Sequence, residues 1–132
     1  MSQNVALLNE YNTLLKSYFI QSIMKIKANE DLSKWNIEIF HFDNIETKKL
    51  LRKYNCSCIE IEIDTNIEEY PKKPPKLTII KPKLKSNKYF DMKFGTKYFQ
   101  DWNSHKTIYE GLCFMHFYLE FNLYRHLILI TQ

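Results

Sequence analysis

Residues 59–80 read IEIEIDTNIEEYPKKPPKLTII, and this stretch decides the fold. Over residues 59–64, isoleucine alternates strictly with glutamate or aspartate, which indicates a strand with one buried face and one face in water. Three of the chain's four prolines then follow within residues 71–75. Because proline fixes φ and lacks a backbone N–H, residues 70–75 are predicted to form a stiff, extended crossover into another short strand at residues 77–80.

The residues before this stretch predict one helix and two further strands. Residues 5–18 place apolar side chains along one stripe of an amphipathic helix. Residues 19–27 are rich in β-favouring side chains, and residues 35–42 alternate between apolar and polar again. Together with the two strands of the opening stretch, they predict a four-stranded antiparallel meander.

The residues after the meander predict helices. Asn103 or Ser104 is placed to cap a helix, and a further short helix is expected over residues 123–130. The whole order predicts an α+β fold in a single domain, residues 1–132, with the helices at one side. The core face of the longer helix is expected to carry Ile108, Leu112, Met115 and Leu119.

Composition and charge exclude several classes of function. The hydrophobic content of 45% suits a folded core rather than a disordered chain. The only two glycines, Gly95 and Gly111, exclude a glycine-rich phosphate-binding loop. The net charge of +4 comes mainly from lysines within residues 72–88. This lysine-rich segment lacks the interleaved aromatic and arginine side chains that are typical of proteins that bind single-stranded nucleic acid. We therefore interpret the lysines as a solvated face and expect no nucleic-acid partner.

The cysteines and histidines do not predict a metal site or a cofactor. Cys56, Cys58 and Cys113 have no zinc-ligand spacing, and the four histidines are scattered. No apolar leader opens the chain, which fits an intracellular, cytoplasmic or nuclear protein in a reducing compartment. Charged residues interrupt the apolar stretch 112–130, so no membrane partner is expected either.

With these elements in order, the chain resembles the ubiquitin-conjugating enzyme fold. The crossover Tyr70-Pro71-Lys72-Lys73-Pro74-Pro75 is similar to that family's Tyr-Pro-x-x-Pro-Pro motif. Trp35 matches the aromatic that opens the family's second strand, and Tyr54 resembles the tyrosine that precedes its third. Trp102, followed by Thr107 and Ile108, resembles the Trp-Ser-Pro-x-x-Thr-Ile motif that leads into the next helix.

The chain departs from this family where the active members carry out catalysis. By alignment from Tyr70, the family's His-Pro-Asn triplet retains only its asparagine, Asn87, and its nucleophilic cysteine falls on Gly95. Counting back from Trp102 places that cysteine on Phe94 instead. Ubiquitin transfer passes through a thioester and needs a thiolate, which neither residue offers. The chain also stops soon after the last motif, without room for the family's pair of C-terminal helices. Both features resemble the catalytically inactive variants of the family, so we expect no enzyme activity.

The resemblance implies non-covalent partners. Such variants bind ubiquitin or a ubiquitin-like protein, and some pair with an active conjugating enzyme. Lys72 and Ser104 stand where active members often carry apolar ligase-docking residues, so ligase recruitment is not expected. Two surfaces are hypotheses for partner contact. The first is the N-terminal helix, whose apolar stripe could instead pack against the core. The second is the polar face of the sheet, whose carboxylates could instead be simply solvated. Their residues are Leu7, Leu8 and Tyr11 on the helix, and Glu38, Glu60 and Glu62 on the sheet.

Two other functions stay open at this point. An RWD-type protein-interaction module shares the topology and the Tyr-Pro element, lacks the cysteine and serves as a subunit in regulatory assemblies. A divergent active conjugating enzyme would instead use another cysteine, and Cys113 is the candidate. Ubiquitin affinity separates the first alternative from the variant, and a reducible ubiquitin adduct would identify the second.

Overall fold

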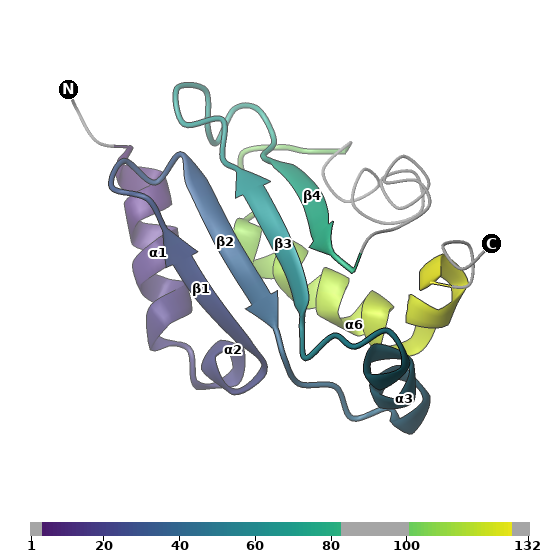
Figure 1. Ribbon diagram of the computed structural model, residues 1–132. Helices are drawn as coiled ribbons and strands as arrows, with labels where there is room; N and C mark the ends of the chain where they lie inside the picture. Colours follow the sequence, from purple (N-terminus) through teal and green to yellow (C-terminus); the bar gives the residue numbers. More distant parts are fainter. Residues whose placement is uncertain (1–3, 83–100, 128–132) are drawn as a thin grey trace.

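The computed structural model describes residues 4–82 and 101–127, which form an α+β fold (Figure 1). The elements are, in chain order, α1 (Val5–Lys16), α2 (Tyr18–Ile23), β1 (Met24–Ala28), β2 (Lys34–Ile39), α3 (Ile45–Lys53), β3 (Ile59–Asp64), β4 (Lys76–Lys81) and α6 (Ile108–Leu127). The predicted fold class is therefore confirmed at the level of an N-terminal helix, a four-stranded sheet and a C-terminal helix.

The four strands form one antiparallel sheet in the order β1-β2-β3-β4, so each strand pairs with its neighbour in sequence. In the register of the two central strands, Trp35 lies opposite Ile63 and Ile37 opposite Ile61. All four of these side chains are fully buried. The predicted meander is confirmed, because the alternation of isoleucine with acidic residues puts every isoleucine of β3 on the same face.

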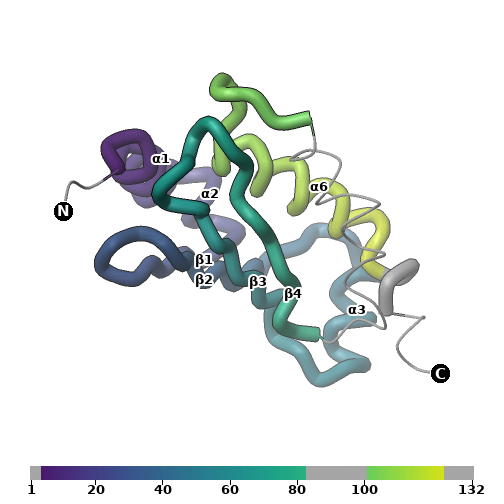
Figure 2. The backbone as a smooth tube through the Cα atoms, turned by 90° about the horizontal axis from the view of Figure 1, so that it is seen from above, coloured from purple at the N-terminus to yellow at the C-terminus, as the bar shows by residue number. Residues whose placement is uncertain are grey.

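Helices cover only one face of the sheet. Figure 2, a view from above, shows α1, α2 and α6 on the same side of the strands. The predicted core face of α6 is confirmed, since Ile108, Leu112, Met115 and Leu119 are all buried. The opposite sheet face has no covering helix among the described residues, and its side chains are mostly polar. In this part of the chain, no helix has the length and apolar character needed to cross a membrane.

Three local predictions about helices are wrong. Residues 19–23 belong to the helix α2 instead of the start of a strand, because Ser17 accepts a hydrogen bond from Ile20 N (3.2 Å) and caps a new helix. The cap of α6 is Thr107, whose Oγ1 accepts from Glu110 N (3.1 Å), whereas Asn103 caps only the preceding turn. The helix then continues without a break to Leu127, so no separate helix begins at residue 123, while residues 128–130 of that prediction lie outside the described residues.

The helix α3, between β2 and β3, was not predicted from the sequence. Asn44 begins it, because its side chain accepts hydrogen bonds from Glu46 N (2.8 Å) and Thr47 N (3.3 Å). Two basic residues in the last turn suit the negative end of the helix dipole. In Figure 1, α3 lies at the end of the sheet beside the C-terminal half of α6.

The connection between β3 and β4, residues 65–75, is called the crossover turn below. Residues 66–73 form consecutive hydrogen-bonded turns, so the extended form predicted for residues 70–75 is wrong over residues 70–73. Asn66 adopts a left-handed conformation (φ 57°), and its carbonyl accepts from Glu69 N and Tyr70 N, both at 2.9 Å. The non-proline residues of the turn keep their N–H groups, and these close the turn despite the neighbouring prolines.

Candidate binding surfaces

Residues from three separate parts of the chain meet in a cluster around a half-buried carboxylate. Glu10 of α1 accepts a hydrogen bond from the hydroxyl of Tyr70 through one oxygen and from Ile108 N (2.8 Å) through the other. The indole Nε1 of Trp102 donates to the carbonyl of Pro71 at 2.6 Å. The rings of Tyr70 and Trp102 lie with their centroids 5.7 Å apart. We call Glu10, Tyr70, Trp102 and Ile108 the Glu10 cluster.

Asn4 ties the crossover turn to the start of α1. Its side-chain Nδ2 donates to the carbonyls of Ile67 (2.9 Å) and Tyr70 (2.8 Å). Its Oδ1 accepts from Leu7 N (3.1 Å) and so caps the helix at the same time. One asparagine therefore fixes both the first turn of α1 and the position of the crossover turn beside it.

Burial changes the acidity of Glu10. Removal from water raises the pKa of this carboxyl, and the hydrogen bond from Tyr70 together with the backbone N–H groups of Ile108 and Tyr109 lowers it in part. The net direction is upward, because desolvation is the largest of these effects. Ionised Glu10 is thus held in place at an energetic cost, which the donors around it partly offset.

The Glu10 cluster brings together residues from two of the motifs that carry the family resemblance. Tyr70 and the carbonyl of Pro71 come from the crossover turn, and Trp102 and Ile108 come from the segment before α6. Pro75 is buried and Pro74 is exposed at the end of the turn, while Thr107 caps α6. Glu10 and Asn4 were missed, since no local pattern distinguishes a carboxylate or an amide that bonds to the chain more than 60 residues away.

The degenerate catalytic positions Asn87, Phe94 and Gly95 lie outside the described residues. Cys58, which precedes β3, has a pKa raised by burial and by the nearby carboxylate of Glu38. Burial and the charge of Glu110 likewise raise the pKa of Cys113. These two thiols are therefore less acidic than a free cysteine, the opposite of what an activated nucleophile needs.

The predicted contact residues of the N-terminal helix are largely core residues. Leu7 is fully buried, so the alternative of core packing is right for this side chain. Leu8 and Tyr11 are half-buried, and the Tyr11 ring packs edge-on against Trp35 at 5.3 Å. The apolar side chains that this region does expose to solvent are Val5, Leu15, Tyr18 and Phe19, of which Tyr18 is the most exposed at 89%.

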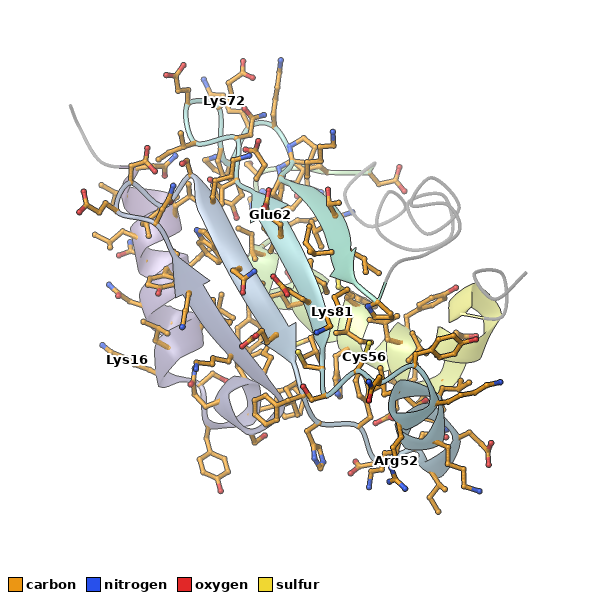
Figure 3. All side chains as sticks on the ribbon, in the orientation of Figure 1. Lys16, Arg52, Cys56, Glu62, Lys72 and Lys81 are labelled. Carbon is orange, nitrogen blue, oxygen red and sulfur yellow. The ribbon has the colours of Figure 1, made fainter. Side chains whose placement is uncertain are left out.

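The predicted acidic residues lie together on the open face of the sheet, but lysines accompany them. Lys34 forms ion pairs with Asp64 (3.1 Å) and Glu62 (3.9 Å). Backbone hydrogen bonding from Asn66 and the side chain of Lys34 lower the pKa of Asp64. The charge of this face is therefore mixed, and Figure 3 labels Glu62 on β3 and Lys81 on the adjacent strand β4. Glu38 lies opposite Lys25 and Glu60, and Glu60 also lies opposite Lys81 and accepts from Asn36 Nδ2 at 2.8 Å.

A buried carboxylate, Glu120, organises the C-terminal half of α6. Glu120, only 7% exposed, accepts from Asp43 N (2.7 Å) and Asn44 N (2.9 Å) through its two oxygens. Its backbone carbonyl accepts from the hydroxyl of Thr47 at 2.7 Å. One turn earlier on α6, His116 bonds through Nε2 to the carbonyl of His41 (2.9 Å). These contacts hold the β2–α3 connection and the first turn of α3 against α6.

A cleft opens beside α3, next to the contacts that Glu120 and His116 make with the β2–α3 connection. It has a volume of about 320 Å³ and lies between the β2–α3 connection, α3 and the α3–β3 connection. Sequence reasoning missed it because it missed α3. We call it the α3 cleft, and it is lined by Phe40, His41, Phe42, Lys48, Leu51, Arg52, Cys56 and Ser57.

The residues that the structure describes include no group of three histidine, cysteine, aspartate or glutamate side chains placed to hold a metal ion. In comparisons with known proteins, no family model matches the chain. No curated protein matches it at a significant level.

Proposed function

We propose that this chain is a non-catalytic relative of the ubiquitin-conjugating enzymes, which binds ubiquitin or a ubiquitin-like protein without forming a covalent bond. The second partner in this proposal is an active conjugating enzyme, for which the chain acts as a scaffold or cofactor. The observation that carries the proposal is the Glu10 cluster. Two sequence motifs that resemble the family, around Tyr70 and around Trp102, lie 32 positions apart in the chain and are joined there by direct contacts.

The order of the elements supports the same proposal. A helix precedes a four-stranded antiparallel meander, the Tyr-Pro segment connects β3 to β4, and α6 follows Trp102. This is the order that the resemblance implies. The helices α2 and α3 are additions to that order, and α3 lies at the end of the sheet away from the crossover turn (Figures 1 and 3).

The absence of a suitable thiol supports a non-catalytic role. The sequence has no cysteine between Cys58 and Cys113. The pKa values of these two thiols are raised, so each is mostly protonated at neutral pH. The third thiol, Cys56, donates a hydrogen bond to the carbonyl of Tyr54 (3.5 Å). A thioester-forming enzyme needs an accessible thiolate, and this chain offers no activated one among the described residues.

The partner surface is proposed to include the exposed apolar side chains at the junction of α1 and α2. Leu15 and Tyr18 are exposed there, beside Phe19 at 50%. Exposed aromatic and aliphatic side chains are the groups that supply most of the binding energy in protein interfaces. The open sheet face, with Glu60 and Glu62, is the second candidate, and its mixed charge suits the polar rim of an interface better than its centre.

The test is a titration of isotope-labelled ubiquitin with the whole protein, followed through amide NMR shifts. We expect localised shifts at micromolar to low-millimolar protein. Tyr18→Ala should weaken binding if the α1–α2 junction is the contact, and Glu62→Lys should weaken it if the open sheet face is. Gln21→Ala, an exposed polar change on the same helix as Tyr18, is the matched control.

A flat titration at millimolar protein would exclude direct ubiquitin binding. The RWD-type interaction module would then be the better description, and the search would move to another protein partner. A ubiquitin adduct that is removed by a reducing agent and lost in Cys113→Ser would contradict the non-catalytic role itself.

A further inference from the structure

The α3 cleft has the dimensions of a small-molecule site. Its volume of about 320 Å³ falls at the lower end of the range for ligand pockets, which runs from about 300 to 1,000 Å³. Three separate chain segments contribute to its lining. Figure 3 marks Arg52 on α3 and Cys56 on the connection that follows it, two of the residues that border the cleft.

One side of the cleft is apolar. Phe42 and Leu51 are buried at its base, with 2% and 6% of their surface exposed. Phe40, at its edge, leaves 48% of its surface in water. A ligand with an apolar body would cover this exposed ring and gain the free energy of removing it from water.

The other side of the cleft is basic. Lys48 and Arg52 are four residues apart on α3, so their side chains leave the same face of the helix. Within the described residues neither forms an ion pair, whereas the adjacent Lys49 pairs with Glu46 (3.9 Å). The described residues that line the cleft include no acid. His41 adds an imidazole, which contacts Asp43 outside the cleft at 3.0 Å.

The walls of the cleft are held in position without a ligand. Glu120 fixes the backbone on one side through the N–H groups of Asp43 and Asn44, and His116 fixes the carbonyl of His41. The imidazole of His116 also stacks on Phe42, with centroids 5.3 Å apart and ring planes within 15°. A site that is already rigid loses little conformational entropy when a ligand binds.

From these features we infer that the α3 cleft binds a small organic anion, a phosphate monoester or carboxylate carried on an apolar body. The oxyanion lies between Lys48 and Arg52, where the hydroxyl of Ser57 lines the same cleft. The apolar body lies against Phe40 and Leu51. This inference is independent of the proposed function, because the cleft shares no residue with the Glu10 cluster or with the α1–α2 junction.

The test uses the whole labelled protein and four probes. Phenyl phosphate and benzoate carry both an oxyanion and a ring, inorganic phosphate carries only the anion, and phenol carries only the ring. We expect phenyl phosphate or benzoate to shift amides of residues 40–57 with millimolar affinity, more tightly than either partial probe. Added salt should weaken the binding, since the attraction is electrostatic.

Variants separate a built site from general attraction to a basic protein. Removing both cations with Lys48→Gln and Arg52→Gln should weaken binding at least about tenfold, because each charged hydrogen bond contributes strongly. The control Lys49→Gln removes the same charge one residue away, from a lysine paired with Glu46, and should leave the affinity unchanged. All three side chains are exposed, so the fold should persist, which the amide spectrum checks.

Three results would overturn the inference. One is the absence of shifts at residues 40–57 at millimolar probe. The second is equal binding of phenol and phenyl phosphate, which would mean that the cations contribute nothing. The third is a loss of affinity in Lys49→Gln as large as that in the variant that lacks both Lys48 and Arg52, which would mean that net charge alone attracts the anion.

Discussion

Replacing Glu10 with alanine should destabilise the protein by about 2–4 kcal/mol, because the hydrogen bonds that its carboxylate accepts from the Tyr70 hydroxyl and from Ile108 N are lost. The hydroxyl of Tyr70 and the backbone N–H of Ile108 both point at this carboxylate, and these residues are 4% and 0% exposed. A hydrogen bond to a charged group contributes about 1.5–3 kcal/mol, so the loss of two such bonds gives a gross cost of about 3–6 kcal/mol. The removal of a desolvated carboxylate offsets part of this cost.

The isosteric replacement Glu10→Gln provides the comparison. Its oxygen still accepts from Ile108 N, and its amide group can donate to the hydroxyl oxygen of Tyr70. It also removes the penalty for burying a charge. We therefore expect the free energy of unfolding of this variant to stay within about 1 kcal/mol of the wild type at neutral pH.

The same pair of proteins should differ in pH dependence. Burial raises the pKa of Glu10 in the folded state above its ordinary value, so the folded chain binds this proton more tightly than the unfolded chain does. The stability that this group contributes is therefore fully present below its unfolded pKa. It is lost as the pH rises through the folded pKa. Glu10→Gln lacks this titration, so the wild type should lose stability relative to it as the pH rises from about 4.

Urea denaturation followed by tryptophan fluorescence measures these effects. Trp35 is fully buried and Trp102 is part of the Glu10 cluster, so the signal reports both the core and the site. Equal destabilisation of less than about 1 kcal/mol in both variants would refute the reasoning, because the carboxylate would then not be satisfying buried donors. A wild-type stability that rises relative to Glu10→Gln over the same pH range would refute the stated direction of the pKa.

Three further outcomes are expected. Glu120→Gln should lower the free energy of unfolding by about 1–3 kcal/mol in urea denaturation, because one of the two backbone N–H groups at its carboxylate would face an amide donor. An unchanged denaturation midpoint would contradict this. Trp102→Phe should cost about 1 kcal/mol by the same assay through loss of the bond to the Pro71 carbonyl, and a stability equal to wild type would show that the bond contributes nothing. Alkylation of Cys58 and Cys113 at pH 8 should be slower in the folded protein than in urea, because burial raises both pKa values, and faster reaction in the folded state would disprove it.

The sequence predicted those elements whose signal is local and repeated. The isoleucine alternation in β3 and the helical spacing of Ile108, Leu112, Met115 and Leu119 each repeat several times within one element. The period of such a pattern is set by the backbone geometry itself, so it survives into the folded structure.

Prediction from the sequence failed for the helices α2 and α3, each of which starts at a single capping residue. Residues 18–23 contain aromatic and isoleucine side chains that favour a strand, but the side chain of Ser17 starts a helix there. The helix α3 has a weak apolar face, with only Thr47 and Leu51 buried. Its signals in the sequence are the cap Asn44 and the basic last turn, which together are typical of a short helix.

The candidate sites were predictable only in part. The motif residues Tyr70 and Trp102 could be named from the sequence, but their common partner could not. Glu10 is separated from Ile108 by 98 positions, and Glu120 from Asp43 by 77. Which carboxylate is buried depends on how the elements pack against one another, and no local pattern of residues encodes that.

The arrangement of the open sheet has a consequence for aggregation. The order β1-β2-β3-β4 leaves two outer strands in the described part of the chain, β1 and β4, whose backbone groups could template a strand from another molecule. Both carry solvent-exposed lysines, Lys25 and Lys27 on β1 and Lys76 and Lys81 on β4. Two copies that approach edge to edge would bring like charges together before any backbone hydrogen bond forms. We therefore expect the folded protein to resist sheet-to-sheet polymerisation at high concentration, and any partner to be recognised through side chains rather than by extension of the sheet.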